Sequence, residues 1–261
     1  MRPWILAETN YGHIKDHPYQ VAVLPTGATE PHNLHLPYGT DTLEGEAIGS
    51  RACEAAWRQG ARVVLLPSIP YGTETNQMHF PLAMNVNPST LGLVIRDLVA
   101  ALERHGLRKL LILNSHGGND FKPLLRELYG TTSVHVFLCD WFRGASADLQ
   151  HELFDVPDDH AGEMETSLAL AYFGDLVVRD PATGKLAADA GAVRATRFSA
   201  VNAGWVSLTR PWHLLTTNTG SGNPHAATAE KGRRLMEGLV ERLSGFLVEL
   251  ANSPLDERFP F

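Results

Sequence analysis

The densest group of side chains that could do chemistry lies between residues 25 and 42. Glu30 and His32 stand two residues apart, and such residues point the same way in an extended segment, so both can reach one site. Asp41 opens the helix predicted next and can fold back towards them. Two carboxylates and an imidazole suit Zn²⁺, Mn²⁺ or Fe²⁺. Taken alone, the same residues also fit a helix cap at Asp41 beside two polar loop residues.

A second motif, NSHGGN at residues 114–119, stands directly between an apolar strand pattern and a helical one. His116 is therefore expected at the end of that strand, where glycines let the backbone approach a ligand closely. A phosphate-binding turn is the competing interpretation, because helix N-termini attract anions. The dinucleotide fingerprint is absent, and a histidine among glycines is better explained by metal binding.

A third motif, HAGEME, fills residues 160–165 and precedes an apolar helical run. Glu165 lies about one turn after Gly162, whereas Glu163 points elsewhere. At least one of these two carboxylates is expected to point inward, next to His160. An acidic first turn favoured by the helix dipole would place the same residues here without any role in binding.

Three further side chains are candidates for substrate contact. Trp141 stands at a predicted strand end and could stack on a substrate, although tryptophans there usually pack into the core. His79 is a candidate for supporting the site from the edge of the pocket. Ser221 lies in a Gly-Ser-Gly-Asn-Pro turn that could line the pocket, but it lacks the spacing of a nucleophile elbow.

The elements that must position these residues follow from the apolar patterns. Four apolar runs predict buried strands at residues 21–24, 63–66, 110–113 and 134–138. Helical patterns cover residues 42–59, about 89–106, about 121–130 and 225–252. This alternation predicts an α/β fold, a three-layer sandwich with a mainly parallel central sheet and helices on both faces.

In such a fold, ligands bind outside the carboxyl ends of the strands. Polar side chains follow each predicted strand at this position: Glu30 and His32, Glu74 and His79, Asn114 and His116, and Asp140 and Trp141. All four groups are therefore expected to face one crevice. Residues 174–223 carry no clear helical or strand pattern.

Composition indicates an ordinary globular protein, which we expect to form a single domain over residues 1–261. Its residues are 44% hydrophobic and 20% charged, and no stretch approaches membrane-spanning length. A net charge of -7 gives no general attraction for nucleic acid or for an acidic membrane. Cys53 and Cys139 fall in a predicted helix and a predicted strand, which fits a reduced, cytoplasmic compartment.

Together the three motifs resemble the creatininase (creatinine amidohydrolase) family, where they occur in this order. The matching pieces are Glu30-x-His32 with GTDT at 39–42, NSHGGN at 114–119, HAG at 160–162 with ETS at 165–167, and AEKG at 229–232. The resemblance spans about residues 24–232 and implies a creatininase-like version of the α/β fold. It also implies a homo-oligomer, commonly a hexamer.

The resemblance implies two divalent metal ions, with zinc preferred and manganese or iron as alternatives. Glu30, His116 and a bridging Asp41 would hold one ion, while His32 and Asp41 would hold the other. His160 would correspond to the catalytic histidine near the attacked group.

The sequence departs from creatininase itself at two places. Creatininase takes a further ligand from a glutamate two residues after the histidine that corresponds to His116, but here that residue is Gly118. By resemblance to family members with a glycine there, Glu165 is expected to supply the missing carboxylate, with Glu163 as the second choice. Residues 80–85, FPLAMN, lack the glycine-threonine that commonly follows this Phe-Pro. Creatinine itself is therefore not the expected substrate.

The expected reaction is hydrolysis of a C–N bond in a small cyclic amide by metal-activated water. Glu165 would orient the water or hold a metal, and His160 would move the proton to the leaving group. The alternative reaction opens the ring of a cyclic ketone or an inositol-derived diketone. A polyhydroxylated ring would find polar partners in Asn33, Asn76, Gln77 and Asn85. A protein of a different class would keep the fold and bind a small molecule without catalysis.

Overall fold

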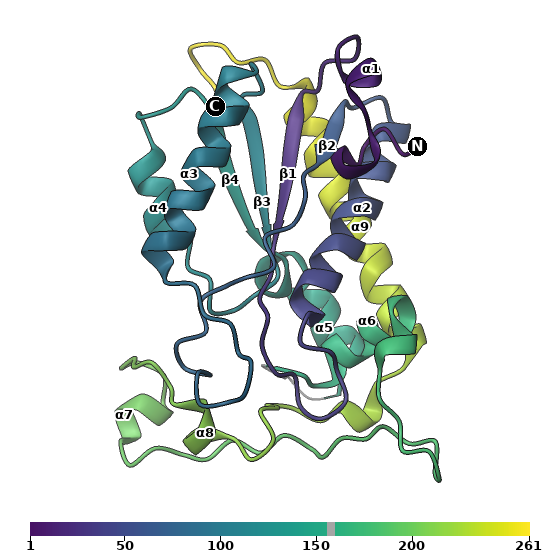
Figure 1. Cartoon of the computed structure of the whole chain (residues 1–261), viewed down its shortest axis with the longest axis vertical. Helices are drawn as coiled ribbons and strands as arrows, with labels where there is room; N and C mark the ends of the chain where they lie inside the picture. Colours follow the sequence, from purple (N-terminus) through teal and green to yellow (C-terminus); the bar gives the residue numbers. More distant parts are fainter. Residues whose placement is uncertain (156–159) are drawn as a thin grey trace.

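A four-stranded parallel sheet forms the middle layer of the molecule (Figure 1). The computed structural model describes residues 1–155 and 160–261. The strands are β1 (Val21–Thr26), β2 (Val63–Leu65), β3 (Lys109–Asn114) and β4 (His135–Asp140). They lie in the order β2-β1-β3-β4, and every neighbouring pair is parallel. The four predicted strands and the predicted α/β fold are confirmed.

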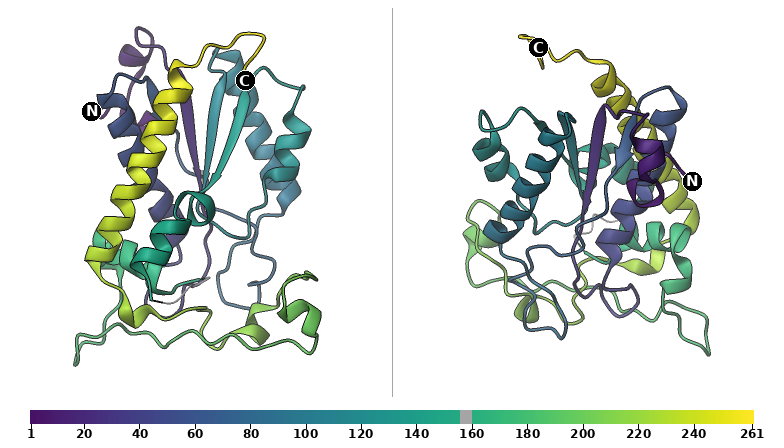
Figure 2. Two further views of the ribbon diagram at one scale, coloured as in Figure 1. Left: turned by 180° about the vertical axis from the view of Figure 1, so that it is seen from behind. Right: turned by 45° about the horizontal axis from the view of Figure 1, so that its top comes forward.

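Helices cover both faces of this sheet because successive strand residues alternate between two apolar cores. The long helices are α2 (Thr40–Arg58), α3 (Pro88–Arg104) and α9 (Ala229–Asn252), and the shorter α4 spans Lys122–Leu128. On one face, Val23 and Leu113 pack with residues of α2 and α9. On the other face, Leu24 and Ile112 pack with residues of α3 and α4. Figure 2 shows these two helix layers with the sheet between them, as the three-layer prediction requires.

The remaining elements are short, and many of them gather at the carboxyl end of the sheet. They are η1 (Leu6–Glu8), α1 (Tyr11–Ile14), η2 (Trp141–Ala145), α5 (Ala147–Leu153), α6 (Glu163–Tyr172), η3 (Gly174–Leu176), α7 (Ser199–Asn202), α8 (Trp212–Leu215) and η4 (Pro224–Ala226). Both chain termini lie at the opposite end (Figure 1). Residues 177–223 cross the carboxyl end as a mostly irregular segment that contains α7 and α8.

None of the helices within residues 1–155 and 160–261 has both the length and the hydrophobicity required to cross a membrane. Cys53 and Cys139 lie in α2 and β4, as predicted, and neither forms a disulfide. A single domain over residues 1–261 and a cytoplasmic location stay predictions.

Helix α9 packs closely against α6, and this contact fixes the start of the third motif. Lys231 forms an ion pair with the buried carboxylate of Glu163. A Cβ atom on Gly232 would lie only 2.0 Å from the carbonyl oxygen of Ser167, so glycine alone allows this approach. The AEKG motif therefore seats α9 on the helix that carries Glu165.

Replacing Gly232 with alanine should destabilise the fold, because the added methyl group must push α9 away from α6. We expect the free energy of unfolding to fall by about 1–3 kcal/mol, as in other overpacked cores, measured by urea denaturation. Gly245→Ala is the matched control in the same helix, since nothing lies within 4 Å of its Cβ position. That change should stabilise the helix by up to about 1 kcal/mol. Equal effects of the two substitutions would contradict this account of the interface.

Candidate metal centre

The side chains of the first two motifs meet at the carboxyl end of the sheet. Glu30 and His32 lie in the loop after β1, Asp41 lies in the first turn of α2, and His116 follows β3. Strands β1 and β3 are parallel neighbours, with Thr26 opposite Asn114, so both loops start side by side. All four side chains are buried, and none is more than 6% exposed. The sheet thus brings together residues that are far apart in sequence.

Asp41 lies between two imidazoles. Its Oδ1 atom is 3.0 Å from His32 Nε2, and its Oδ2 atom is 3.0 Å from His116 Nδ1. The same His116 nitrogen is 3.0 Å from Glu30 Oε1. Ligand atoms that share one ion at about 2.0–2.2 Å lie roughly 3 Å from each other. One carboxylate with an oxygen directed to each of two imidazoles is the geometry that a bridging ligand requires.

Backbone carbonyl groups orient the three histidines. His32 Nδ1 is 3.0 Å from the Glu30 carbonyl oxygen, His116 Nε2 is 3.1 Å from that of Thr73, and His160 Nε2 is 2.9 Å from that of Pro31. A carbonyl oxygen can only accept, so each of these nitrogens carries the proton and donates it. The other ring nitrogen of each histidine then faces the buried carboxylates, where its lone pair can bind a proton or a metal ion. Metal-binding histidines are held in this way.

The buried charges of the cluster depend on one another. Burial lowers the pKa of His32, but the surrounding carboxylates, Asp41 first, together outweigh burial and raise it to about 10. Burial likewise opposes the charged form of His116, yet Glu30 and Asp41 hold its pKa well above the usual value. The two imidazoles in turn hold the pKa of Asp41 well below its usual range, against the effect of burial. The carboxylates therefore require positive charge beside them, which a metal ion can supply as well as a proton.

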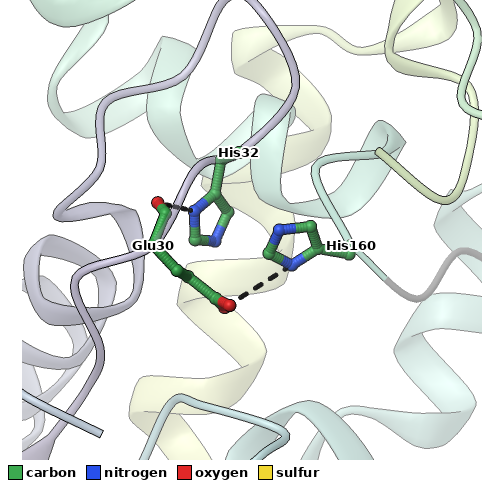
Figure 3. A group of neighbouring side chains, drawn as sticks. All are labelled: Glu30, His32 and His160. Atoms are coloured by element: carbon green, nitrogen blue, oxygen red, sulfur yellow. Dashed lines mark hydrogen bonds and ion pairs between the residues drawn. The ribbon is translucent and has the colours of Figure 1, made fainter. Parts of the chain in front are cut away.

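The third motif completes the cluster from α6 and from the three residues before that helix. His160 is buried, its Nδ1 atom is 3.8 Å from Glu30 Oε1, and its ring centroid is 4.1 Å from that of His32 (Figure 3). Burial, and next the charge of His32, lower the pKa of His160. Glu165 offers a carboxylate oxygen that lies within 4.8 Å of ligand atoms of His32 and Asp41. Glu163 instead points to Lys231, so of the two alternatives the structure brings Glu165 to the site.

The three candidates for substrate contact, Trp141, His79 and Ser221, lie outside the cluster of carboxylates and imidazoles. Trp141 is 1% exposed and packs in the core below the site, where its indole N–H donates to Ser115 Oγ at 2.9 Å. This packing matches the competing interpretation of Trp141 as a core residue, and its contact with a substrate stays a prediction. His79 is exposed and stacks on His213 at 3.6 Å between ring centroids. Ser221 pairs its backbone with that of His160, at 3.0 and 2.7 Å, and so holds the histidine in place. Contact of His79 or Ser221 with a substrate stays a prediction.

A cavity of about 330 Å³ opens beside the cluster. Glu30, Asp41, His116, His160 and Glu165 line it on one side. Asn76 and Gln77 also line it, and the Gln77 amide donates to Glu30 Oε2. This volume suits a small molecule that contacts both the cluster and polar side chains.

Sequence reasoning missed two residues here and assigned no role to a third. Arg210 and Trp212 line the cavity but come from the irregular segment 177–223, and the Trp212 ring lies 4.9 Å from that of His160. No local pattern in that segment signals their position. Glu74 places a carboxylate oxygen within 4.8 Å of ligand atoms of Glu30 and His116. Burial, and next the charge of Glu30, raise the pKa of Glu74 to about 8. Its position after β2 is the one sequence signal that pointed to the crevice.

Comparison with known proteins identifies the family. The sequence matches the model of the creatininase, or creatinine amidohydrolase, family over residues 7–247. The chain belongs to the creatininase family. The family resemblance of the three motifs is thereby confirmed, and the chain is a hydrolase of this family.

Relatives in this family carry different names. The creatinine amidohydrolase of Pseudomonas putida is 32% identical over 179 residues, which is 61% of this chain and 67% of the relative. The mycofactocin precursor peptide peptidase of Mycobacterium ulcerans is 27% identical over 229 residues, 84% of this chain and 81% of the relative. The 3-dehydro-scyllo-inosose hydrolase of Thermotoga maritima is 24% identical over 164 residues, 59% of this chain and 51% of the relative. The family therefore includes hydrolases with different substrates.

Solved structures share this fold. A candidate creatinine amidohydrolase from Bacteroides fragilis is 35% identical, with a TM-score of 0.88 over 98% of this chain and all of the other. Creatininase structures at 23% identity include a manganese form, with a TM-score of 0.74, and a zinc–zinc form of a variant, with a TM-score of 0.73. The first covers 96% of this chain and 99% of the other, and the second covers 95% and 98%.

Removing divalent ions should destabilise the protein, because the carboxylates around Asp41 then lose their counter-charges. At an ion concentration about 100 times Kd, an ion that binds only the folded state raises the free energy of unfolding by about 2.7 kcal/mol. We expect the Tm of chelator-treated protein to rise when Mn²⁺ or Zn²⁺ is restored, as measured by thermal unfolding. The Asp41→Asn variant should show a much smaller rise. An equal rise in both proteins would contradict a centre built on Asp41.

Proposed function

We propose that this chain is a metal-dependent hydrolase in which two divalent ions activate water for attack on a small cyclic amide. The observation that carries the proposal is the position of Asp41, with one carboxylate oxygen 3.0 Å from each of His32 and His116. Zinc is our first choice for the ions, with manganese or iron as alternatives. Manganese and zinc forms of solved creatininases support this choice.

The donor set fits two ions that share Asp41. Glu30, Asp41 and His116 would hold the first, and His32, Asp41 and Glu165 would hold the second. The ions, when bound, lower the pKa of water and polarise the substrate carbonyl. The protein supplies the rest of the reaction, which is positioning and proton transfer.

His160 is the residue we assign to proton transfer. Its Nε2–H donates to the Pro31 carbonyl oxygen, which leaves Nδ1 free to accept a proton beside Glu30. The Ser221 backbone and the Trp212 ring hold the imidazole at the cavity wall. His160 would take the proton of the attacking water and deliver it to the nitrogen that leaves. Glu165, close to His32 and Asp41, would orient the water or hold the second ion.

A C–N bond is the substrate bond that the relatives favour. Creatinine amidohydrolase and a peptide peptidase both have names that describe hydrolysis at such bonds. A cyclic amide fits a cavity of about 330 Å³ better than a long peptide does. Creatinine itself stays disfavoured, because Gly118 cannot supply the carboxylate expected there.

Ring opening of a cyclic ketone or an inositol-derived diketone is the second candidate reaction. The relative named 3-dehydro-scyllo-inosose hydrolase supports it, and so do the amides of Asn76 and Gln77 in the cavity. The other two proposed polar partners have structural contacts: Asn33 bonds Asp189 and Thr219, and Asn85 bonds the Glu74 backbone. A homo-oligomer, a hexamer by family resemblance, stays a prediction for either reaction.

Elemental analysis of the purified protein tests the paired metal centre. We expect two equivalents of divalent metal in the unaltered protein and one or none in Asp41→Ala, because Asp41 is the shared ligand. Glu165→Gln should also lose metal, whereas Glu163→Gln should keep two equivalents because Glu163 pairs with Lys231. An unchanged metal content in Asp41→Ala would remove the bridge from the proposal.

Turnover assays on lactams and on cyclic diketones separate the candidate reactions. We expect the lactam series to be hydrolysed, and His160→Asn to lower kcat by about 10²–10⁴-fold with its metal content intact. Hydrolysis of the diketones but not of the lactams would instead support ring opening of a cyclic ketone or diketone. A metal-bound protein that turns over neither class, and whose ligand affinity is the same in His160→Asn, would be a binding protein.

A further inference from the structure

We propose that Glu74 is a ligand of the first metal centre, beside Glu30, Asp41 and His116, an inference that rests on the proposed function. Glu74 lies in the loop after β2, outside all three motifs. One of its carboxylate oxygens, one of Glu30 and a ring nitrogen of His116 lie within 4.8 Å of one another. This spacing is short enough for one ion to contact all three residues after small side-chain adjustments.

The Glu74 carboxylate is buried with no hydrogen-bond donor beside it among the described residues, and its charged neighbour is the Glu30 carboxylate. The residue is 0% exposed, and neither carboxylate oxygen accepts a hydrogen bond from the described residues. Buried polar groups are nearly always satisfied, and an unsatisfied carboxylate is among the costliest groups to bury. Gln77, the next polar residue of the same loop to reach the cluster, donates to Glu30 instead. A cation held between Glu74, Glu30 and His116 would satisfy the carboxylate.

The backbone next to Glu74 explains why residue 118 contributes no carboxylate. A Cβ atom on Gly118 would lie 2.3 Å from the Thr73 carbonyl oxygen and 2.4 Å from His116 Nε2. No side chain fits at that position while the loop after β2 lies here. The same Thr73 carbonyl accepts the hydrogen bond of His116 Nε2 at 3.1 Å. The loop that excludes a side chain at 118 therefore orients His116 and brings Glu74 to the cluster.

Two asparagines hold this loop in place. The Glu74 backbone N–H donates to Asn85 Oδ1 at 2.8 Å, and the Thr73 backbone N–H donates to Asn119 Oδ1 at 3.1 Å. Asn119 also donates to Asn114 Oδ1 at 3.1 Å, which ties the loop to the end of β3. Glu74 is thus positioned by fixed neighbours, as metal ligands usually are.

Adding Glu74 changes the charge and the metal preference of the centre. Glu30, Asp41, Glu74 and Glu165 together carry a charge of about -4 when ionised, which two divalent ions neutralise. The first ion would then have carboxylates from three residues and one imidazole. Sites made mainly of oxygen ligands suit manganese, whereas zinc also binds well to sites with nitrogen or sulfur ligands. We therefore expect Glu74 to move the preference of the first centre from zinc towards manganese.

Titration of chelator-treated protein with Mn²⁺, followed by electron paramagnetic resonance and calorimetry, tests the role of Glu74. The unaltered protein should bind two equivalents. Glu74→Gln has nearly the same shape, and it should bind one of these equivalents at least about 10-fold more weakly, since even the loss of an outer-shell partner costs 10–100-fold. Its ratio of Mn²⁺ to Zn²⁺ affinity should fall as well. Unchanged stoichiometry and affinity in folded Glu74→Gln would overturn the inference.

Glu44→Gln is the matched control. Glu44 is also a buried glutamate, and it lies in α2 outside the described groups whose ligand atoms are close enough to share an ion. Its Mn²⁺ binding should equal that of the unaltered protein, and an equal loss in both variants would contradict a specific role for Glu74. Failure of the unaltered protein to bind any divalent ion would instead overturn the proposed function.

A crystal structure of the Mn²⁺-loaded protein answers the question without any variant, and so covers the case in which Glu74→Gln does not fold. We expect a Glu74 oxygen within roughly 2.0–2.3 Å of the ion that His116 binds, close to the usual metal–carboxylate distance. A loaded centre in which no Glu74 oxygen coordinates either ion would overturn the inference.

Discussion

The buried carboxylate of Asp41 lies between the imidazoles of His32 and His116, and the rest of the site depends on this contact. A carboxylate with 2% exposure can stay ionised only when positive charge lies beside it. Each imidazole has its second nitrogen tied to a backbone carbonyl, so neither ring can turn away. The arrangement thus presents fixed lone pairs and fixed negative charge to the same small volume. Protons can neutralise that charge, but divalent cations match it better.

The parallel sheet makes this contact possible. Strands β1 and β3 end at the same level, because Thr26 pairs with Asn114, and their following loops carry Glu30, His32 and His116. Helix α2 begins at this level too, so its first turn brings Asp41 into the space between the loops. Two apolar cores hold the sheet rigid from both faces. The candidate metal centre is therefore built mainly from loop residues, but each loop begins at the end of a strand that the two cores hold in place.

Segments without recognisable motifs complete the site. The loop after β2 orients His116 through the Thr73 carbonyl and places Glu74 and Gln77 around Glu30. The segment 177–223 crosses the open end of the cluster and adds Arg210 and Trp212 to the cavity. Relatives with different substrates share the family, and these two segments hold four of the cavity residues that lie outside the three motifs, Asn76, Gln77, Arg210 and Trp212. They are the places where specificity can vary while the paired carboxylate and imidazoles stay in place.

The sequence by itself determined the layers of the fold and the central residues of the site. Continuous apolar runs and helical stripes are local signals, and in a parallel sheet the residues after each strand must meet at one edge. Glu30, His32, Asp41 and His116 could therefore be predicted to converge. Tertiary structure decided the direction of individual side chains. Glu163 points away because it pairs with Lys231 of α9, and Trp141 is buried because its ring packs in the core and its indole N–H donates to Ser115. Glu74 reached the cluster because Asn85 and Asn119 hold its loop, and such contacts between distant segments leave no periodic trace in the chain.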